Sequence, residues 1–483
     1  MFYYNDFLQS EDKEQFIQNA IEAWKVTSIY KTALIAKQYD ENNNVTIKTF
    51  QKFITDTCGN RFPDLISANN KIATAKFNEL LTQTTQYSLA NGINYAEGID
   101  IDEQLGRQID SETAVATRLA MRDGQVFVYY DGVNTIPFTV LEFVPLYDEN
   151  TGALMAGIRF FQIEKDKPLN VLFYETDGVT QYRSTGKNIN LIEINKKQTY
   201  ALEINSTKSR GVISAESISM NKLPIVELKG NMYGISFLNF VRDKIDSLDL
   251  TISGLANDLD MNEFVFWIVK NSGGMDAADL SRFRQHLKTT GIASIDSEDG
   301  GGVEHFTKDV PVEARTRYIE IMLDQIYSAW GAFDLSKLSN GAVNMLQINA
   351  LFAVADNRAS ELELEIKKYI IQILALKGIE IFDWQISFVR NKLVSAQQTA
   401  IDDQMNTNTV MNVSSELDDR TILETLKNKT TLFADIDVEE ILKEKSLESI
   451  SLVNNETEAP SIGQDTEQPE EKIVEKDVQQ PEE

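Results

Sequence analysis

The spacing of hydrophobic residues divides the chain into helical regions and a strand-rich middle. Between residues 10 and 37, apolar residues recur at roughly helical spacing, which predicts helix. A second helix is predicted through "NKIATAKFNELLTQTTQYSLANG", with Asn69 or Asn70 as its cap and Gly92 at its end. From about residue 124, runs such as "QVFVYYDG" and "NVLFYETDG" favour strands divided by tight turns. We therefore expect an α+β fold in which helices surround an antiparallel sheet.

A long helix with a narrow apolar seam is predicted next, within "ISFLNFVRDKIDSLDLTISGLANDL". Its apolar residues step by three and four positions, which suits packing against one or two neighbouring helices. The seam consists of Leu238, Val241, Ile245, Leu248, Ile252, Leu255 and Leu259.

A second long helix is predicted to begin at Pro311, after an α/β insert. The insert contains "EFVFWIVKN", a short helix "AADLSRFRQHLKT" and two strands around "DSEDGGG". The two long helices thus flank the insert like the sides of a hairpin. The apolar stripe of the second helix is Ile319, Met322, Leu323, Ile326, Trp330 and Phe333.

A third long helix is predicted to end near Gly378, and a strand "WQISFVR" and shorter helices follow it. Its stripe is Leu351, Ala355, Ala359, Leu362, Ile366, Tyr369 and Ile373. The polar loop "AFDLSKLSNGAVN" joins this helix to the second one. Taken alone, such a loop is best interpreted as an ordinary surface turn.

Charge narrows the possible partners. The formal net charge of the 483 residues is −28, so the surface repels phosphate and will not grip DNA through counterion release. This does not exclude a protein that DNA must pass without sticking. The tail after Leu452 is acidic and poor in large apolar residues, which predicts disorder. It is interpreted as a solvating tail or as a docking segment.

The residues that most enzymes and metal sites require are scarce. Cys58 is the single cysteine, and His286 and His305 are the two histidines, so disulfides, thiolate metal sites and His-based triads are not expected. No phosphate-binding loop occurs. No apolar run approaches the length of a membrane span, and the N-terminus does not read as a secretory signal. We expect no cofactor and no enzymatic activity.

Five segments follow one another in a specific order: "SANNKIATAKFNELLTQTTQYSLANG", "FVPLYDENTGALMAGIRFFQ", "IDSLDLTISGLANDLDM", "DVPVEARTRYIEIMLDQIYSAWG" and "ADNRASELE". With this order and spacing the chain resembles a tailed-bacteriophage portal protein of the type found in siphophages of Gram-positive hosts. The similarity covers most of residues 1–446. Arg358 stands where the family usually has Lys.

The resemblance implies a portal fold with an antiparallel wing sheet, long stem helices, a small α/β clip and a helical crown. The implied divisions are a wing (1–234), stem helix 1 (235–263), a clip (264–310), stem helix 2 (311–333), a tunnel loop (334–344), a long wing helix and strand (345–394), crown helices (395–450) and a disordered acidic tail (451–483).

It also implies a homo-oligomeric ring, usually a dodecamer, at one capsid vertex of the virion, assembled in the host cytoplasm. Double-stranded DNA would pass through its channel without sequence specificity during packaging and ejection. The implied partners are the large terminase, the head–tail connector or adaptor, the major capsid protein and the scaffolding protein, with no membrane.

The resemblance also implies roles for three groups of residues. The tunnel loop would present Ser336, Lys337, Ser339, Asn340, Gly341 and Asn344 to DNA, and Lys337 is the nearest substitute for a family Lys located just past the loop. Stem packing would use Leu238, Val241, Ile245, Leu248, Ile252, Leu255, Ile319, Met322, Ile326 and Trp330. The clip would dock partners through Arg282, Arg284 and Lys288. The alternative is a non-viral oligomeric helical scaffold protein, and an enzyme is the third class.

Overall fold

The computed structural model describes most of the chain. The described residues are 2–55, 59–65, 67–96, 101, 105–106, 108–132, 134–164, 166–184, 190–204, 216–219, 222–262, 266–270, 278–279, 282, 302–306, 311–334, 345–391, 396–412, 417–430, 433, 437–439 and 441–443. They fall into two compact units, residues 1–392 and 393–483.

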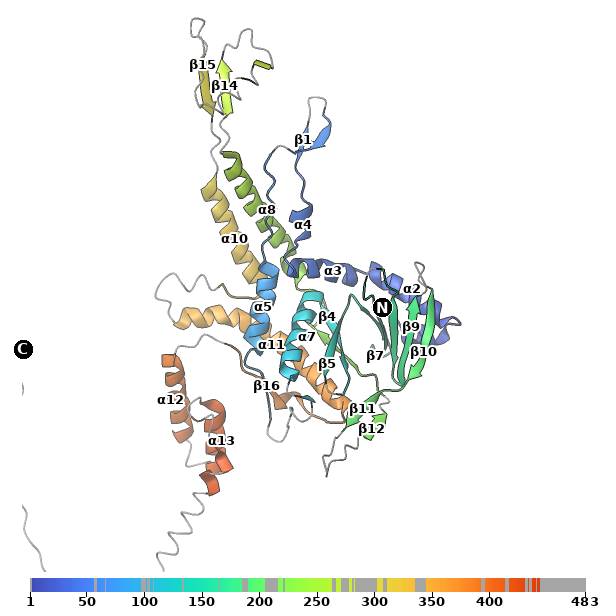
Figure 1. The fold of residues 1–483 in the computed structure, drawn as a ribbon. Helices are drawn as coiled ribbons and strands as arrows, with labels where there is room; N and C mark the ends of the chain where they lie inside the picture. The colour runs from blue at the N-terminus through green and yellow to red at the C-terminus, as the bar shows by residue number, and fades with distance from the viewer. Residues whose placement is uncertain are drawn as a thin grey trace, which may run out of the picture. The chain divides into compact units, whose positions relative to one another are not determined.

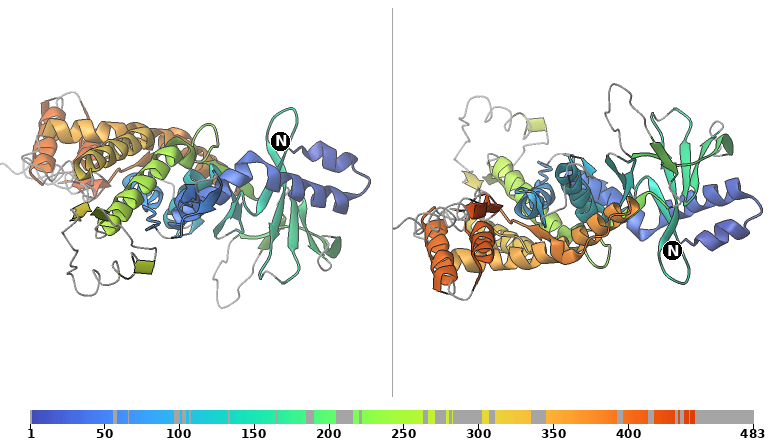
Figure 2. Two further views of the ribbon diagram at one scale, coloured as in Figure 1. Left: turned by 90° about the horizontal axis from the view of Figure 1, so that it is seen from above. Right: turned by 90° about the horizontal axis from the view of Figure 1, so that it is seen from below.

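A five-stranded antiparallel sheet forms one part of the first unit (Figure 1). Its strand order is β10-β9-β8-β7-β6, and consecutive strands are neighbours, as expected for a meander. Helix α2 packs across it, as the views along the vertical direction show (Figure 2). The strands are β6 (Phe143–Tyr147), β7 (Leu154–Phe161), β8 (Asn170–Glu175), β9 (Gly178–Ser184) and β10 (Leu191–Gln198).

A three-stranded sheet of order β13-β4-β5 lies beside α7 (Ile109–Asp123). The strands are β4 (Gln125–Tyr130), β5 (Thr135–Thr139) and β13 (Ile225–Lys229). Gly124 joins α7 to β4 with φ of +100°, and a Cβ there would lie 2.5 Å from the carbonyl oxygen of Gly234. A side chain therefore does not fit at this turn. The antiparallel sheets expected after residue 124 are confirmed.

The N-terminal helical region consists of several helices rather than one. Thr27 ends α2 and caps α3, because its hydroxyl oxygen accepts a hydrogen bond from the Tyr30 amide at 3.3 Å. The helix predicted through "NKIATAKFNELLTQTTQYSLANG" is present, but it begins at Lys76, so the predicted cap at Asn69 or Asn70 was wrong. The helices are α1 (Tyr4–Gln9), α2 (Lys13–Val26), α3 (Ser28–Asp40), α4 (Val45–Thr49) and α5 (Lys76–Leu89).

The three predicted long helices are present as α8 (Leu238–Asn262), α10 (Val312–Trp330) and α11 (Met345–Leu376). Pro311 precedes the first helical residue of α10, one position earlier than the expected first-turn proline. Gly378, with φ of +78°, follows the end of α11. None of the described helices is both long and apolar enough to cross a lipid bilayer.

Short antiparallel pairs complete the first unit. β1 (Phe53–Thr55) pairs with β2 (Arg61–Pro63), β11 (Ala201–Ile204) with β12 (Glu216–Ser219), and β14 (Phe266–Lys270) with β15 (Gly302–Phe306). β3 (Ile93–Tyr95) pairs with β16 (Ile386–Phe388), which the short helix η2 (Asp383–Gln385) precedes. The predicted insert helix lies largely outside the described residues, as does the strand expected before "DSEDGGG".

The second unit contains α12 (Ala396–Asn412) and α13 (Asp419–Lys429). The Asn406 side chain on α12 donates to the carbonyl oxygen of Lys429 at 2.9 Å. Among the side chains of these helices that the structure describes, Val410 and Leu426 are the buried apolar ones. The predicted tail lies outside the described residues.

Candidate functional site

Helices α8 and α10 run antiparallel, side by side (Figure 1). Leu238 near the start of α8 and Trp330 at the end of α10 belong to one buried cluster, whereas Asp258 near the end of α8 pairs with Arg315 near the start of α10. We call these two helices the stem pair. Seven of the predicted stem residues are buried in that cluster, and Ile252 and Ile319 pack against it half-buried. The seven are Leu238, Val241, Ile245, Leu248, Met322, Ile326 and Trp330.

The apolar seam of α8 is deeply buried only in its first half. Leu255 is half-buried and Leu259 is 51% exposed. Between residues 249 and 260 the buried side chains of α8 are polar, namely Asp249, Ser253 and Asn257. These residues are four positions apart and therefore share one face of the helix.

Asp249 occupies the centre of this polar face. Its carboxylate accepts hydrogen bonds from the Asn44 amide at 2.5 Å and from the Thr74 backbone amide and hydroxyl at 2.9 and 2.6 Å. Burial raises the pKa of the Asp249 carboxyl above its ordinary range, although these donors oppose the change. The carboxylate thereby joins α8 to two other segments of the chain.

The segment of residues 70–74 lies along the same face, and we call it the clasp. The Ile72 amide donates to the Ser253 hydroxyl at 2.9 Å, and the Asn70 amide donates to the Asn257 side chain at 2.6 Å. The Asn70 side chain reaches Asp260 at 2.5 Å. Asn70 does not cap a helix as predicted, because α5 begins only at Lys76, and the N–H groups of Asn70 bind α8 instead.

The end of α10 is held firmly where the polar loop begins. Trp330 is fully buried, and its indole nitrogen donates to the Thr84 hydroxyl on α5 at 2.8 Å. Its ring lies 5.1 Å from that of Phe237 and 5.8 Å from that of Phe77. Helices α5 and α10 and the residue that precedes α8 thus meet at this one side chain.

Arg358 on α11 holds the chain at the end of α10, at Trp330 and Gly331. Its Nε donates to the Trp330 carbonyl oxygen at 2.9 Å, and its Nη1 lies 2.7 Å from Glu361. The guanidinium carbon also lies 5.1 Å from the centre of the Phe237 ring, within range of a cation–π contact. Gly331 adopts a left-handed conformation with φ of +83°, and a Cβ there would lie 3.3 Å from Arg358 Nε.

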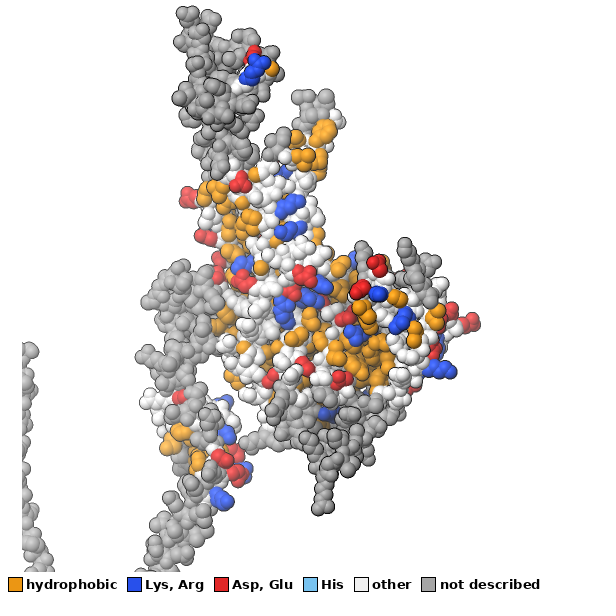
Figure 3. Space-filling model, viewed as in Figure 1, with side chains coloured by type: hydrophobic (Ala, Val, Ile, Leu, Met, Phe, Trp, Pro, Cys, Tyr) orange, Lys and Arg blue, Asp and Glu red, His pale blue; other side chains and the backbone are white. Residues whose placement is uncertain are grey.

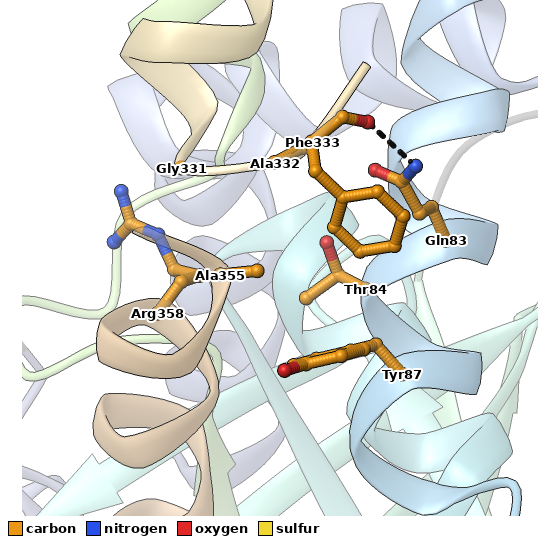
Figure 4. A pocket seen from close by; sticks show the side chains of 8 residues that line it. All are labelled: Gln83, Thr84, Tyr87, Gly331, Ala332, Phe333, Ala355 and Arg358. Carbon is orange, nitrogen blue, oxygen red and sulfur yellow. Dashed lines mark hydrogen bonds between the residues drawn. The ribbon is translucent and has the colours of Figure 1, made fainter. Parts of the chain in front are cut away.

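Phe333 lines a small cavity at the start of the loop (Figure 4). Its ring packs edge-on against Tyr87 at 5.7 Å and against Phe352 at 4.8 Å. Its carbonyl oxygen accepts a hydrogen bond from the Gln83 side chain at 2.9 Å. We call this region the loop base. Its cavity is lined by Gln83, Thr84, Tyr87, Gly331, Ala332, Phe333, Ala355 and Arg358.

A polar network supports the loop base from below. The Tyr87 hydroxyl donates to Asp356 at 2.6 Å, and Arg390 binds the same carboxylate at 2.8 Å. Arg390 also forms a two-nitrogen contact with Glu363 at 2.8 and 2.9 Å. Burial and the Asp356 carboxylate raise the pKa of Tyr87 above its ordinary value, so it remains a neutral donor.

The residues predicted to act in the loop and the clip mostly lie outside the described part of the chain. Of the loop, the structure describes residues 332–334, but Ser336, Lys337, Ser339, Asn340, Gly341 and Asn344 are not described. Of the clip residues, Arg282 is exposed and lies 3.5 Å from Asp279. Arg284 and Lys288 are not described.

Sequence reasoning did not identify the loop base. Gln83 and Tyr87 lie on α5, about 250 residues before the loop they contact. Arg358 was noted because of its place in "ADNRASELE", but its contact with Trp330 was not foreseen. No local pattern identifies such contacts, because they join helices that are distant in sequence.

Comparison with known proteins gives consistent matches. A family model described as "Phage portal protein, SPP1 Gp6-like" matches residues 36–376. The portal protein of Bacillus phage SPP1 is 20% identical over 409 residues, covering 78% of this chain and 77% of that protein. The portal protein of Clostridium phage phiCD119 is 26% identical over 163 residues, 33% of this chain. That match spans 36% of the Clostridium phage protein.

A structural comparison also finds a chain from the neck of a native GTA particle computed with C12 symmetry. The TM-score is 0.36 and the sequence identity 9%, with coverage of 72% of this chain and 87% of that chain.

Proposed function

Because the chain belongs to the SPP1 Gp6-like family of phage portal proteins, we propose that it assembles into a ring at one capsid vertex, through which the phage genome enters and leaves. The observation that carries this proposal is the family match over residues 36–376, which spans the stem pair, the loop and α11. The comparisons give no support to a non-viral scaffold. In this proposal the subunits form a dodecamer in the virion neck, after assembly in the host cytoplasm.

The loop base gives the loop a role in this proposal. A loop that leaves from Trp330, Gly331 and Phe333 starts at a fixed point, because these residues are held by α5 and α11. The loop itself is short, polar and rich in Ser, Asn and Gly, so it can adjust to a moving duplex at little energetic cost. We assign it as the tunnel loop that borders the channel.

DNA passes this channel without being gripped. The net charge of −28 disfavours stable binding of DNA phosphate groups to the channel surface. Lys337 supplies one positive charge per subunit, repeated around the ring, and its contact with phosphate is transient. No base is read, so passage is independent of sequence.

The residues around β14 and β15 form the clip in this proposal and dock other phage proteins. Arg282, Arg284 and Lys288 supply positive charge there in an otherwise acidic chain, and such charges mainly set association rates and partner choice. The proposed partners are the large terminase, the head–tail connector, the major capsid protein and the scaffolding protein. The role is structural rather than enzymatic.

Electron microscopy of the purified protein tests the ring. We expect closed rings with an axial channel, and a uniformly monomeric protein under assembly conditions would contradict the proposal.

The loop assignment is tested by packaging. We expect Lys337→Ala, or a chain with residues 336–341 shortened, to form normal rings and proheads but to package or retain less DNA. The measurement is nuclease-protected DNA per prohead in vitro. Lys196→Ala, which removes an exposed lysine of β10, is the matched control. Full-length packaging at the wild-type rate by the loop variants would show that the segment is an ordinary turn.

A further inference from the structure

Two exposed apolar patches lie on either side of α8. The first, which we call the hairpin patch, consists of Phe53, Ile54, Phe62 and Leu65 on and beside the β1–β2 hairpin. Its first three members are about half exposed and Leu65 is 87% exposed. The second, the helix patch, consists of Tyr318 and Ile321, which are three positions apart on α10 and are 41% and 39% exposed. Figure 3 shows apolar side chains gathered at both places.

Helix α8 separates the two patches. Helix α10 meets α8 at Ser247, whose hydroxyl lies 2.8 Å from that of Tyr318, and at Asp258. The clasp, which follows the hairpin in the chain, meets α8 at Asp249 and Asn257. At 3.6 residues per turn these two contact faces are roughly a third of a turn apart. In the view of Figure 1, α10 and β1 accordingly lie on different sides of α8.

The hairpin is tied to the stem pair rather than free. The Asp64 amide donates to the Lys52 carbonyl oxygen at 2.9 Å, and the Lys52 ammonium donates to the carbonyl oxygen of Ala68 at 2.5 Å. Ala68 lies two residues before the clasp. The hairpin patch is therefore presented from a fixed base, which keeps the entropy lost on docking low.

The charges beside the two patches differ in sign. Lys48, Lys52 and Arg61 accompany the hairpin, and the Arg61 guanidinium lies over the Phe53 ring at 5.0 Å. Glu313, Arg317 and Glu320 lie on the exposed face of α10, where Arg317 pairs with Glu320 at 2.9 Å and Glu313 leaves the face with a net negative charge. In a chain of net charge −28, a basic face is unusual and is complementary to the acidic face on the other side.

We propose that the hairpin patch of one copy packs against the helix patch of the next copy around the ring. This inference rests on the proposed function. Two different patches on different sides of a subunit form a head-to-tail interface, which can be repeated until a ring closes. A second copy is the occupant that fits, because its α10 offers both apolar area and carboxylates. Burial of the apolar side chains also offsets the repulsion between strongly acidic copies.

The test uses two full-length variants, each damaged in one patch. The hairpin variant carries Phe53→Asp and Phe62→Asp, and the helix variant carries Tyr318→Asp and Ile321→Asp. We expect each variant alone to form rings with a yield at least about tenfold below wild type, because a charge then faces an apolar partner. Mixed together, the two variants should form dimers and no rings, because each retains one intact patch and the intact patches are complementary.

Mass photometry measures the assemblies, and circular dichroism confirms that each variant is folded. The control is Ile163→Asp, which places a charge at an exposed apolar residue after β7 and should leave rings intact. If wild-type protein forms rings and both patch variants do so equally well, the inference is wrong and the patches bind another phage protein. If wild-type protein forms no rings, the proposed function itself fails.

Cross-linking provides a second measurement that does not depend on loss of assembly. In a Cys58→Ser background, Leu65→Cys combined with Tyr318→Cys should give a ladder of covalent oligomers with a short bis-thiol reagent. Leu65→Cys combined with Ile163→Cys should not. A ladder from the control pair alone would place the hairpin against a different face and overturn the inference.

Discussion

At the scale of single residues, burial separates side chains that sequence periodicity treats as equivalent. Leu248 and Leu259 belong to the same predicted seam of α8, yet Leu248 is 1% exposed and Leu259 is 51% exposed. The free-energy cost of placing a carboxylate at each position follows from this difference. A carboxylate at position 248 would lose its hydration, whereas one at position 259 would retain it.

We therefore expect Leu248→Asp to lower the free energy of unfolding by about 3–5 kcal/mol and to reduce ring assembly. Leu259→Asp serves as the matched control and should change the free energy of unfolding by less than about 0.5 kcal/mol. Thermal unfolding followed by circular dichroism, together with negative-stain images, measures both effects. Equal melting of the two variants would argue against the packing described for the stem pair.

At the scale of elements, periodicity predicted the long helices but not what covers them. Helices α8, α10 and α11 were foreseen because apolar residues repeat over many turns. The stretch around Asn70 was misread as helix, because its polar donors reach side chains nearly 190 residues away. The loop base was missed for the same reason, since Gln83, Tyr87 and Phe333 come together only in the folded chain.

The contacts between Asp249 and the clasp lead to a second prediction about stability. Asp249→Ala leaves the Asn44 and Thr74 donors without their acceptor, so we expect a loss of about 2–4 kcal/mol in the free energy of unfolding. Asp260→Ala removes an exposed acceptor from the same segment and should cost far less. Hydrogen exchange at residues 70–74 should rise in the first variant, and unchanged protection there would contradict the assigned role of Asp249.

At the scale of the whole molecule, we expect the acidic tail to be dispensable for assembly. The segment after Leu452 has almost nothing to bury, so its removal should leave ring formation and the melting temperature unchanged. The measurement is ring yield and thermal unfolding of a chain ending at Leu452. Loss of rings in this shortened protein would make the tail a structural part of the assembly.

The pairing of β3 with β16 sets the order in which the subunit can be completed during synthesis. Ile93 lies opposite Phe388, and the Tyr87 carbonyl oxygen accepts from the Asn391 amide at 2.9 Å. Translation of the intervening residues takes roughly 15–60 s at the usual rate of synthesis. During that interval the N-terminal half has an unpaired strand and the loop base lacks α11. Only a chain whose translation has passed residue 391 can complete the β3–β16 pair and the hydrogen bond to Tyr87.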